Sequence, residues 1–325
     1  MSVQETRATE LLSQTGVERS LPSVSLIIPT RNRPEQLRSC LEACARLEYP
    51  RHLVEFLLVD DGSSPPVSQL LEALPGGVRA RVLRQNLSGP AAARNRGIEE
   101  AAGELLVFLD DDCLPVPDWL LRFADAYRKR PSAAFGGRTV NRLPNCLCSA
   151  TSQLLINYLY QYFGRQAPGR GFFASNNLAA PREALRALGG FDIAFPLAAG
   201  EDRELCDRWL LAGFALQYVA EAVVRHGHWI SFRGFCRQHV RYGRGAFHFQ
   251  RSRRRRGLAI RIEPVRFYRD LVLYPFRQSS GLRALRQSML LAVSQVCNAA
   301  GFALEAGRAW RRGRQPDRPG GENPK

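Results

Sequence analysis

Apolar runs alternate with amphipathic stretches in the first part of the chain. Residues 24–28 form an apolar, β-prone run, and the stretch after it places Leu37, Leu41 and Cys44 on one face of a helix. The same alternation predicts strands at 55–59, 81–84 and 105–109 and helices at 67–74, 91–102 and 118–127. Strands that alternate with helices form parallel sheets whose faces are covered. The pattern therefore predicts an α/β fold with a mostly parallel sheet flanked by helices.

The two ends of the chain follow a different pattern. Residues 1–20 are polar and aperiodic, which predicts a flexible N-terminal arm. We expect the α/β domain to span residues 21–230. A basic, largely helical region should follow at 231–325, ending in a disordered tail that is rich in Pro and Gly from Pro316 onwards.

The positive charge of the chain is concentrated in this C-terminal region. The formal net charge is +16, and residues 231–325 hold 21 Lys or Arg against 5 Asp or Glu, whereas the rest of the chain holds 25 of each. Such a region attracts polyanions, so nucleic acid and anionic lipid are both candidate partners. The chain has eight cysteines and no apolar signal segment in its first residues, so we expect reduced thiols in the cytoplasm.

Carboxylates gather where the predicted strands end. Pro29 and Thr30 follow the first strand, Asp60 and Asp61 follow the second, and residues 110–112 are three successive aspartates after the fourth. Ligands of such sheets collect at the carboxyl ends of the strands. Three adjacent aspartates repel one another unless a cation lies among them, and a hard divalent ion that bridges to a substrate diphosphate would meet that need. The alternative is a solvated acidic loop that caps the helix predicted at 118–127.

Four segments resemble, in order and spacing, the donor half of family 2 glycosyltransferases of the GT-A fold, non-processive bacterial type. They are residues 25–33 (SLIIPTRNR), 59–63 (VDDGS), 89–97 (GPAAARNRG) and 108–112 (FLDDD). The similarity continues through residues 175–178 (SNNL), 189–192 (GGFD), 200–205 (GEDREL) and 223–228 (VVRHGH), and so covers about residues 21–230.

The resemblance implies roles in binding a nucleotide-sugar donor. The base and ribose contacts implied in this way are Pro29, Thr30, Arg33, Asp60 and Asp61. Arg94 is implied as a base or phosphate contact, since its planar guanidinium suits oxyanions. In the D-x-D motif, we expect Asp112 to hold the metal, manganese or magnesium (Mn or Mg), and Asp110 or Asp111 to face the ribose.

A second metal ligand is implied in the His-Gly-His segment. We expect His226 to be that ligand, with His228 as a rival, and the alternative is a structural histidine at a strand end. The resemblance also implies that Asp202 is the base that deprotonates the acceptor hydroxyl and that Glu201 orients the acceptor. The alternative for Asp202 is a helix N-cap. The expected reaction is a single displacement that inverts the anomeric carbon of a hexose.

Two segments of the C-terminal region concern processivity and attachment to a membrane. Residues 237–242 (RQHVRY) depart from the Q-x-x-R-W motif of processive members at Tyr242, so we expect one sugar per encounter. Residues 287–304 carry no charge but are interrupted by polar side chains, which favours an amphipathic helix on a bilayer, or packed on the domain, over a span. With Arg251 and the arginines at 253–256 nearby, the region is interpreted as a peripheral anchor on the inner face of the membrane; a solvated basic face or linker is the alternative.

These features predict an enzyme of polysaccharide or other cell-envelope saccharide synthesis with a saccharide or lipid-linked acceptor. A sugar-phosphate nucleotidyltransferase is the first alternative, but it would need a glycine-rich loop directly after the first strand, where residues 29–32 (PTRN) have no glycine. A non-enzymatic membrane or nucleic-acid binding protein would leave the carboxylates without a purpose. Nucleic acid is therefore not an expected partner.

Overall fold

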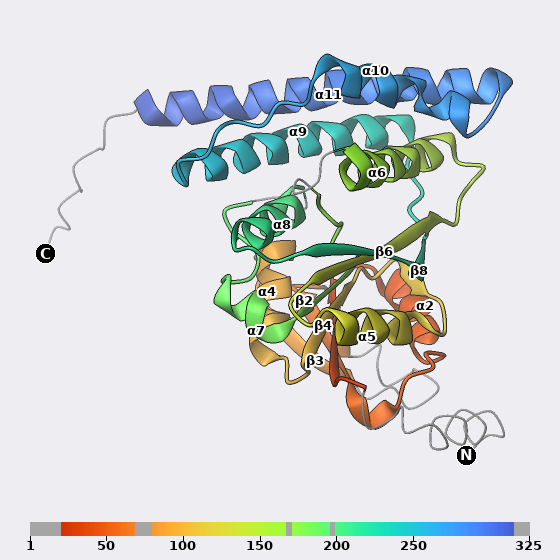
Figure 1. The fold of residues 1–325 in the computed structure, drawn as a ribbon, viewed down its shortest axis with the longest axis vertical. Coiled ribbons are helices and arrows are strands. Elements are labelled where there is room, and N and C mark those ends of the chain that lie inside the picture. Colours follow the sequence, from red (N-terminus) through yellow and green to blue (C-terminus); the bar gives the residue numbers. More distant parts are fainter. Residues whose placement is uncertain (1–20, 69–79, 167–170, 196–198, 315–325) are drawn as a thin grey trace, which may run out of the picture. The chain divides into compact units, whose positions relative to one another are not determined.

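The computed structural model describes residues 21–68, 80–166, 171–195 and 199–314. The chain divides into two compact units, residues 1–230 and residues 231–325 (Figure 1). The predicted arm at 1–20, most of the helix predicted at 67–74 and the predicted tail from Pro316 lie outside the described residues.

The first unit is built on a sheet whose strand order is β3-β2-β1-β4-β7-β6-β8-β5. The strands are β1 (Val24–Thr30), β2 (Val54–Asp61), β3 (Ala80–Gln85), β4 (Leu105–Leu109), β5 (Cys113–Pro115), β6 (Ala134–Asn141), β7 (Asn177–Pro181) and β8 (Leu216–His226). β1, β2, β3 and β4 are parallel to their neighbours in this group, as predicted. β7 is antiparallel to β4 and β6, and β5 is antiparallel to β8, so the sheet of this α/β fold is mixed.

Helices cover both faces of this sheet (Figure 1). They are α2 (Pro34–Cys44), the short η2 (Arg51–Leu53), α4 (Pro90–Glu100), α5 (Trp119–Lys129), α6 (Leu147–Gln166), α7 (Arg182–Ala187) and α8 (Glu201–Leu211). Side chains alternate along β1, so Leu26 and Ile28 pack in one cluster with α2 and α5, whereas Ile27 packs in the other with α4, α7 and α8. A proline in the first turn of α2 and of α4 starts each helix directly after the loop at a strand end.

The second unit consists of α9 (Phe232–Arg255), α10 (Val265–Leu273), the short η3 (Tyr274–Arg277) and α11 (Gly281–Arg314). Two glycines let α9 and α11 pack closely: a Cβ on Gly243 would lie 1.9 Å from the Asn298 carbonyl oxygen, and one on Gly301 would lie 2.0 Å from that of Val240. The buried Glu305 of α11 accepts a hydrogen bond from Arg244 of α9 at 2.7 Å.

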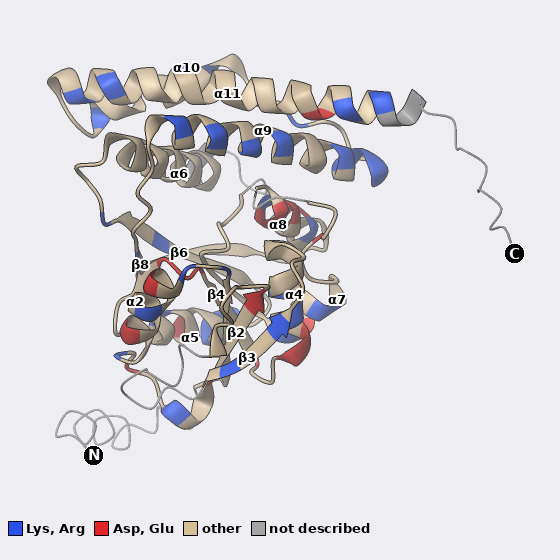
Figure 2. Ribbon diagram, turned by 180° about the vertical axis from the view of Figure 1, so that it is seen from behind, with Lys and Arg blue, Asp and Glu red and all other residues tan. Residues whose placement is uncertain are grey.

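The surface of the second unit is strongly basic and partly apolar. α9 contains eight arginines and no acidic residue, and Figure 2 shows the basic positions spread along the helix. α11 exposes a row of apolar side chains between its ends, namely Leu282, Leu285, Met289, Val296 and Trp310. By length and composition alone, residues 281–311 suffice to cross a membrane, with 28% of their most apolar window buried.

Candidate active site

The carboxyl ends of β1, β2 and β4 meet at one edge of the sheet, as predicted. Pro29 and Thr30 pair in register with the end of β2, and the aspartates at 110–112 follow β4 directly. Thr30 Oγ1 donates a hydrogen bond to Asp111 at 2.7 Å. Arg33 Nη1 contacts both Asp111, at 3.1 Å, and Asp112, at 3.0 Å. Burial raises the pKa of Asp111 to about 6, although Arg33 and Thr30 act in the opposite direction.

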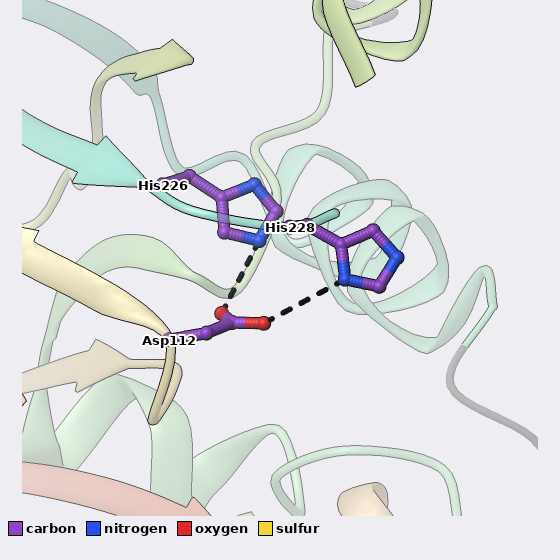
Figure 3. A group of neighbouring side chains, drawn as sticks. All are labelled: Asp112, His226 and His228. Atoms are coloured by element: carbon purple, nitrogen blue, oxygen red, sulfur yellow. Dashed lines mark ion pairs between the residues drawn. The ribbon is translucent and has the colours of Figure 1, made fainter. Parts of the chain in front are cut away.

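Asp112 also contacts two histidines (Figure 3). The pairing of β5 with β8 sets Cys113 beside His226, and the backbone N–H of Gly227 donates to the Asp112 carbonyl oxygen at 3.2 Å. His226 Nε2 lies 3.2 Å from one carboxylate oxygen of Asp112, and His228 Nδ1 lies 4.0 Å from the other. The two imidazole rings are nearly parallel, with centroids 5.8 Å apart. Both histidines proposed from the sequence therefore face the same aspartate.

The charges in this group depend on one another. Burial raises the pKa of Asp112, but the hydrogen bond and charge of His226 outweigh burial and bring that pKa to about 2. Burial conversely lowers the pKa of His226, and Asp112 raises it above its ordinary 6.5. Burial and the neighbouring His226 together lower the pKa of His228. The aspartate is thus held ionised, as a metal ligand must be.

Asp112, His226 and His228 fit a divalent metal. One ligand atom from each lies within 4.8 Å of the others. A carboxylate with two imidazoles suits a transition metal such as Mn²⁺ better than Mg²⁺, which prefers oxygen ligands and retains several waters. The neighbouring Asp110 and Asp111 do not belong to this group and face other partners.

Arg94 connects the aspartate loop to the start of α8. Its side chain is 4% exposed, and it contacts Asp110 and Glu201, each at 3.0 Å. The guanidinium also lies 5.5 Å from the centroid of the Phe191 ring. Both terminal nitrogens are engaged within the protein, so a contact with a nucleotide base or phosphate, as expected from the sequence, would need one of these pairs to open.

Glu201 and Asp202 are the first two residues of α8. Glu201 is 3% exposed, and its Oε2 has no hydrogen-bond partner. Burial and the neighbouring Asp202 raise the pKa of Glu201 to about 7, against the charge of Arg94. Burial also raises the pKa of Asp202, whose carboxylate accepts from the backbone N–H groups of Arg203 and Ser175.

The alternative that Asp202 caps α8 is wrong. Gly200 occupies the N-cap position with a φ of 91°, and no side chain makes a capping hydrogen bond there. Asp202 lies two positions further along, inside the first turn of the helix, where the positive end of the helix dipole favours a carboxylate. Its raised pKa and its position at the helix start make it suitable for accepting a proton.

Asp60 is fully buried, with 0% of its surface exposed, and stabilises the loop after β2. It accepts hydrogen bonds from the backbone N–H groups of Ser63, at 2.8 Å, and Val67, at 3.3 Å. Arg84 at the end of β3 adds a third contact at 3.2 Å. Sequence reasoning missed Arg84, although its place at the carboxyl end of a predicted strand was a usable signal.

Asp61 is similarly engaged with the loop before α4. It accepts hydrogen bonds from the Gln85 side chain at 2.9 Å and from the backbone N–H groups of Ser88 and Gly89 at 2.8 and 2.9 Å. Asp60 and Asp61 therefore shape the loops around the edge of the sheet. A nucleotide contact by either one stays a prediction.

The chain matches the model of glycosyl transferase family 2 over residues 25–189, which is half of its length. It is 27% identical over 209 residues to the glycosyltransferase AglE of Haloferax volcanii, covering 64% of this chain and 67% of that protein. It is 30% identical over 307 residues to an N-acetylglucosaminyltransferase of Sinorhizobium fredii, covering 89% and 70%. Other curated relatives are longer, and the chain spans only 46% of one of them.

Solved structures show the same architecture. A mannosyltransferase from Pyrobaculum calidifontis, solved with GDP-mannose and Mn²⁺, superposes with a TM-score of 0.54 at 21% identity, covering 91% of this chain and 82% of that one. At this identity the likeness supports the GT-A fold alone. The family match and the curated relatives show that the chain belongs to glycosyl transferase family 2.

Proposed function

We propose that this glycosyltransferase moves a sugar from a nucleotide-diphosphate sugar to a hydroxyl acceptor, with inversion and with the help of a divalent metal. The observation that carries the proposal is the group formed by Asp112, His226 and His228 beside Thr30 and Arg33 at one edge of the sheet. Asp112 and His226 would hold the metal, and His228 is close enough to join them.

The donor side of the site lies around β1 and β2. Pro29, Thr30, Arg33, Asp60 and Asp61 surround the strand ends there, and we assign them to the nucleotide. Asp110 and Asp111 are assigned to the ribose side, and Arg94 is assigned to the diphosphate. The bound metal would neutralise charge on the diphosphate as the sugar leaves.

The acceptor side lies at the start of α8. Asp202 takes the proton from the acceptor hydroxyl while that oxygen attacks the anomeric carbon, and the bond from this carbon to the diphosphate breaks on the opposite face. One displacement inverts the anomeric centre. Glu201, held by Arg94 at 3.0 Å, orients the acceptor. The raised pKa of Asp202 supports its role, because a base closer in pKa to neutrality binds the transferred proton more readily.

The acceptor is proposed to be a saccharide, free or lipid-linked, met at the cytoplasmic face of a membrane during polysaccharide synthesis. The row of exposed apolar side chains on α11 and the arginines of α9 support attachment to anionic lipid. Residues 282–310 would extend about 42 Å as a helix, compared with about 30 Å for the hydrocarbon core. The uncharged residues 287–304 are fewer than the residues spanned by the row of exposed apolar side chains, which runs from 282 to 310. A helix that lies in the membrane interface therefore fits better than one that crosses the bilayer upright.

Two substitutions separate the donor and acceptor halves of the proposal. We expect Asp112→Asn to weaken the binding of UDP or GDP in the presence of Mn²⁺ by roughly 10- to 100-fold, because a ligand to the metal is lost.

Asp202→Asn should bind the nucleotide as the wild type does and lose roughly 100-fold or more in transfer, because only the proton acceptor is lost. Titration calorimetry and release of the nucleoside diphosphate from a panel of nucleotide sugars measure the two effects.

Asp125→Asn provides a matched control, because Asp125 is exposed and pairs with Lys129 on the surface of α5. It should behave as the wild type in both assays. Nucleotide binding that is the same with and without Mn²⁺, in the wild type and in Asp112→Asn alike, would refute the metal site. Transfer at the wild-type rate by Asp202→Asn would refute the assigned base.

A further inference from the structure

Trp229 is a strongly exposed tryptophan beside the metal-binding group. The chain has four tryptophans, of which Trp119 and Trp209 are fully buried. Trp229 is 71% exposed, and it directly follows His228 in the sequence. An indole ring is among the largest apolar groups in a protein and is usually well buried, so its exposure at this position calls for an explanation.

The backbone around Trp229 is held on both sides. Before it, the Gly227 N–H donates to the Asp112 carbonyl oxygen at 3.2 Å, and the Arg142 N–H donates to the His226 carbonyl oxygen at 2.9 Å. After it, Ile230 is 7% exposed, and its carbonyl oxygen accepts from the Cys146 thiol at 3.5 Å. The exposed ring therefore projects from a segment that is fixed at both ends.

The same contacts place Trp229 near the reaction centre. Trp229 is two residues from Gly227, so their Cα atoms are no more than about 7 Å apart. Gly227 is hydrogen-bonded to Asp112 itself. Arg33 approaches Asp112 from the β1 side, where we assign the nucleotide, whereas the segment with Trp229 continues from β8 on the histidine side.

We propose that Trp229 is a binding platform for the acceptor, on which a sugar ring stacks its apolar C–H face. The inference rests on the proposed transfer to a saccharide acceptor and adds a residue to the acceptor side of that site. An indole suits this task because it is large and rigid, so it offers contact area at a small cost in side-chain entropy. Because the indole ring is exposed in the structure, a sugar ring can reach its face directly.

A kinetic experiment tests this role with octyl glycosides of glucose, galactose, mannose and N-acetylglucosamine as acceptor probes. We expect Trp229→Ala to raise the KM for the probe that is best used by roughly 10-fold or more, with a smaller change in kcat. Trp229→Phe should recover most of the loss, because it keeps an aromatic face. Leu211→Ala is the control: Leu211 is an exposed apolar residue at the far end of α8, and its removal should change neither constant.

A binding experiment gives a second readout that needs no transfer. In the Trp310→Phe background, Trp229 is the one exposed tryptophan left. The buried Trp119 and Trp209 also emit, so a response is assigned to Trp229 only if it is lost when Trp229→Phe is added to this background. We expect a saturable change with at least one octyl glycoside and none with an octyl oligoethylene glycol ether, which has the same chain but no sugar. The same response to both compounds, or no saturable response to any glycoside, would overturn the proposal.

Calorimetry with UDP or GDP and Mn²⁺ keeps this inference apart from the proposed function. Trp229→Ala should bind the nucleotide like the wild type. Equal loss of nucleotide binding and transfer in Trp229→Ala would place the residue on the donor side and overturn the acceptor role. Absence of metal-dependent nucleotide binding in the wild type, by contrast, would contradict the proposed function itself, and the fluorescence readout would still decide whether Trp229 binds sugar.

Discussion

At the scale of single residues, the fold disfavours the charged form of Glu201. The carboxyl group is buried, one of its oxygens has no partner, and its pKa is raised to about 7. A raised pKa means that the folded protein holds the proton more tightly than the unfolded chain does, where the ordinary value is 4.5. The stability contributed by this group is therefore fully present below pH 4.5 and is lost as the pH rises through 7.

Glu201→Gln should remove this pH dependence. At pH 4.5 the variant and the wild type should unfold with similar free energies, because both side chains are then neutral. By pH 8 the variant should be the more stable of the two, by on the order of 3 kcal/mol at most, since it never buries a charge. Urea unfolding between pH 4.5 and 8 measures the difference. Glu99→Gln, at an exposed surface position, should follow the wild type throughout; a constant offset between Glu201→Gln and the wild type would contradict the assigned pKa.

The sequence predicted which residues would gather at this site better than it predicted what each would contact. Thr30, Arg33, Asp111, Asp112 and His226 lie together as expected, because strand ends in a parallel sheet share an edge. The internal pairing of Arg94 with Glu201 could not be foreseen, because 107 residues separate the two in the chain and only tertiary packing joins them.

At the scale of helices, the crossing of α9 and α11 depends on glycine. Gly301→Ala should destabilise the second unit by about 1–3 kcal/mol, because the new Cβ would overlap the Val240 carbonyl oxygen and push the helices apart. Gly307→Ala, six residues further along α11, has no atom within 4 Å of the new Cβ and should stabilise the helix by up to about 1 kcal/mol. Thermal unfolding followed by circular dichroism compares the two. Effects of the same sign would contradict the close crossing.

The strands divide into a predictable and an unpredictable group. β1, β2, β3 and β4 were located within a few residues, and β1, β2 and β4 each contain an apolar run that ends at a polar loop. β6 and β7 were not predicted: β6 carries two adjacent glycines and polar positions, and β7 is five residues long and ends in proline. Their antiparallel pairing joins distant segments, which local periodicity does not encode.

At the scale of the whole molecule, the charge and the apolar row of the second unit predict how the protein meets a membrane. Wild-type protein should float with liposomes that contain anionic lipid at low salt and remain unbound to neutral ones, since each basic residue near anionic lipid contributes about 1 kcal/mol. Met289→Glu combined with Val296→Glu should reduce flotation strongly, because both side chains belong to the exposed row on α11.

Nucleotide binding by the same double variant provides the control, because its substitutions lie outside the first unit and should leave that affinity unchanged. Wild-type protein that stays unbound under every condition would contradict membrane attachment. Attachment that withstands both high salt and carbonate extraction would instead indicate that α11 crosses the bilayer.

Added salt should have opposite effects on the stability of α9 and on its binding to anionic lipid. Its eight arginines have no acidic residue on the same helix, and pairs such as Arg237 and Arg241 stand four residues apart, where like charges repel. Dissolved ions screen that repulsion, so added salt should stabilise the helix in free solution. The same screening should weaken the binding of α9 to anionic lipid. An anionic lipid surface would supply negative charge to α9 at low ionic strength. The second unit should therefore be least stable in dilute buffer without membranes, and lipid headgroups should replace salt as its counter-ions.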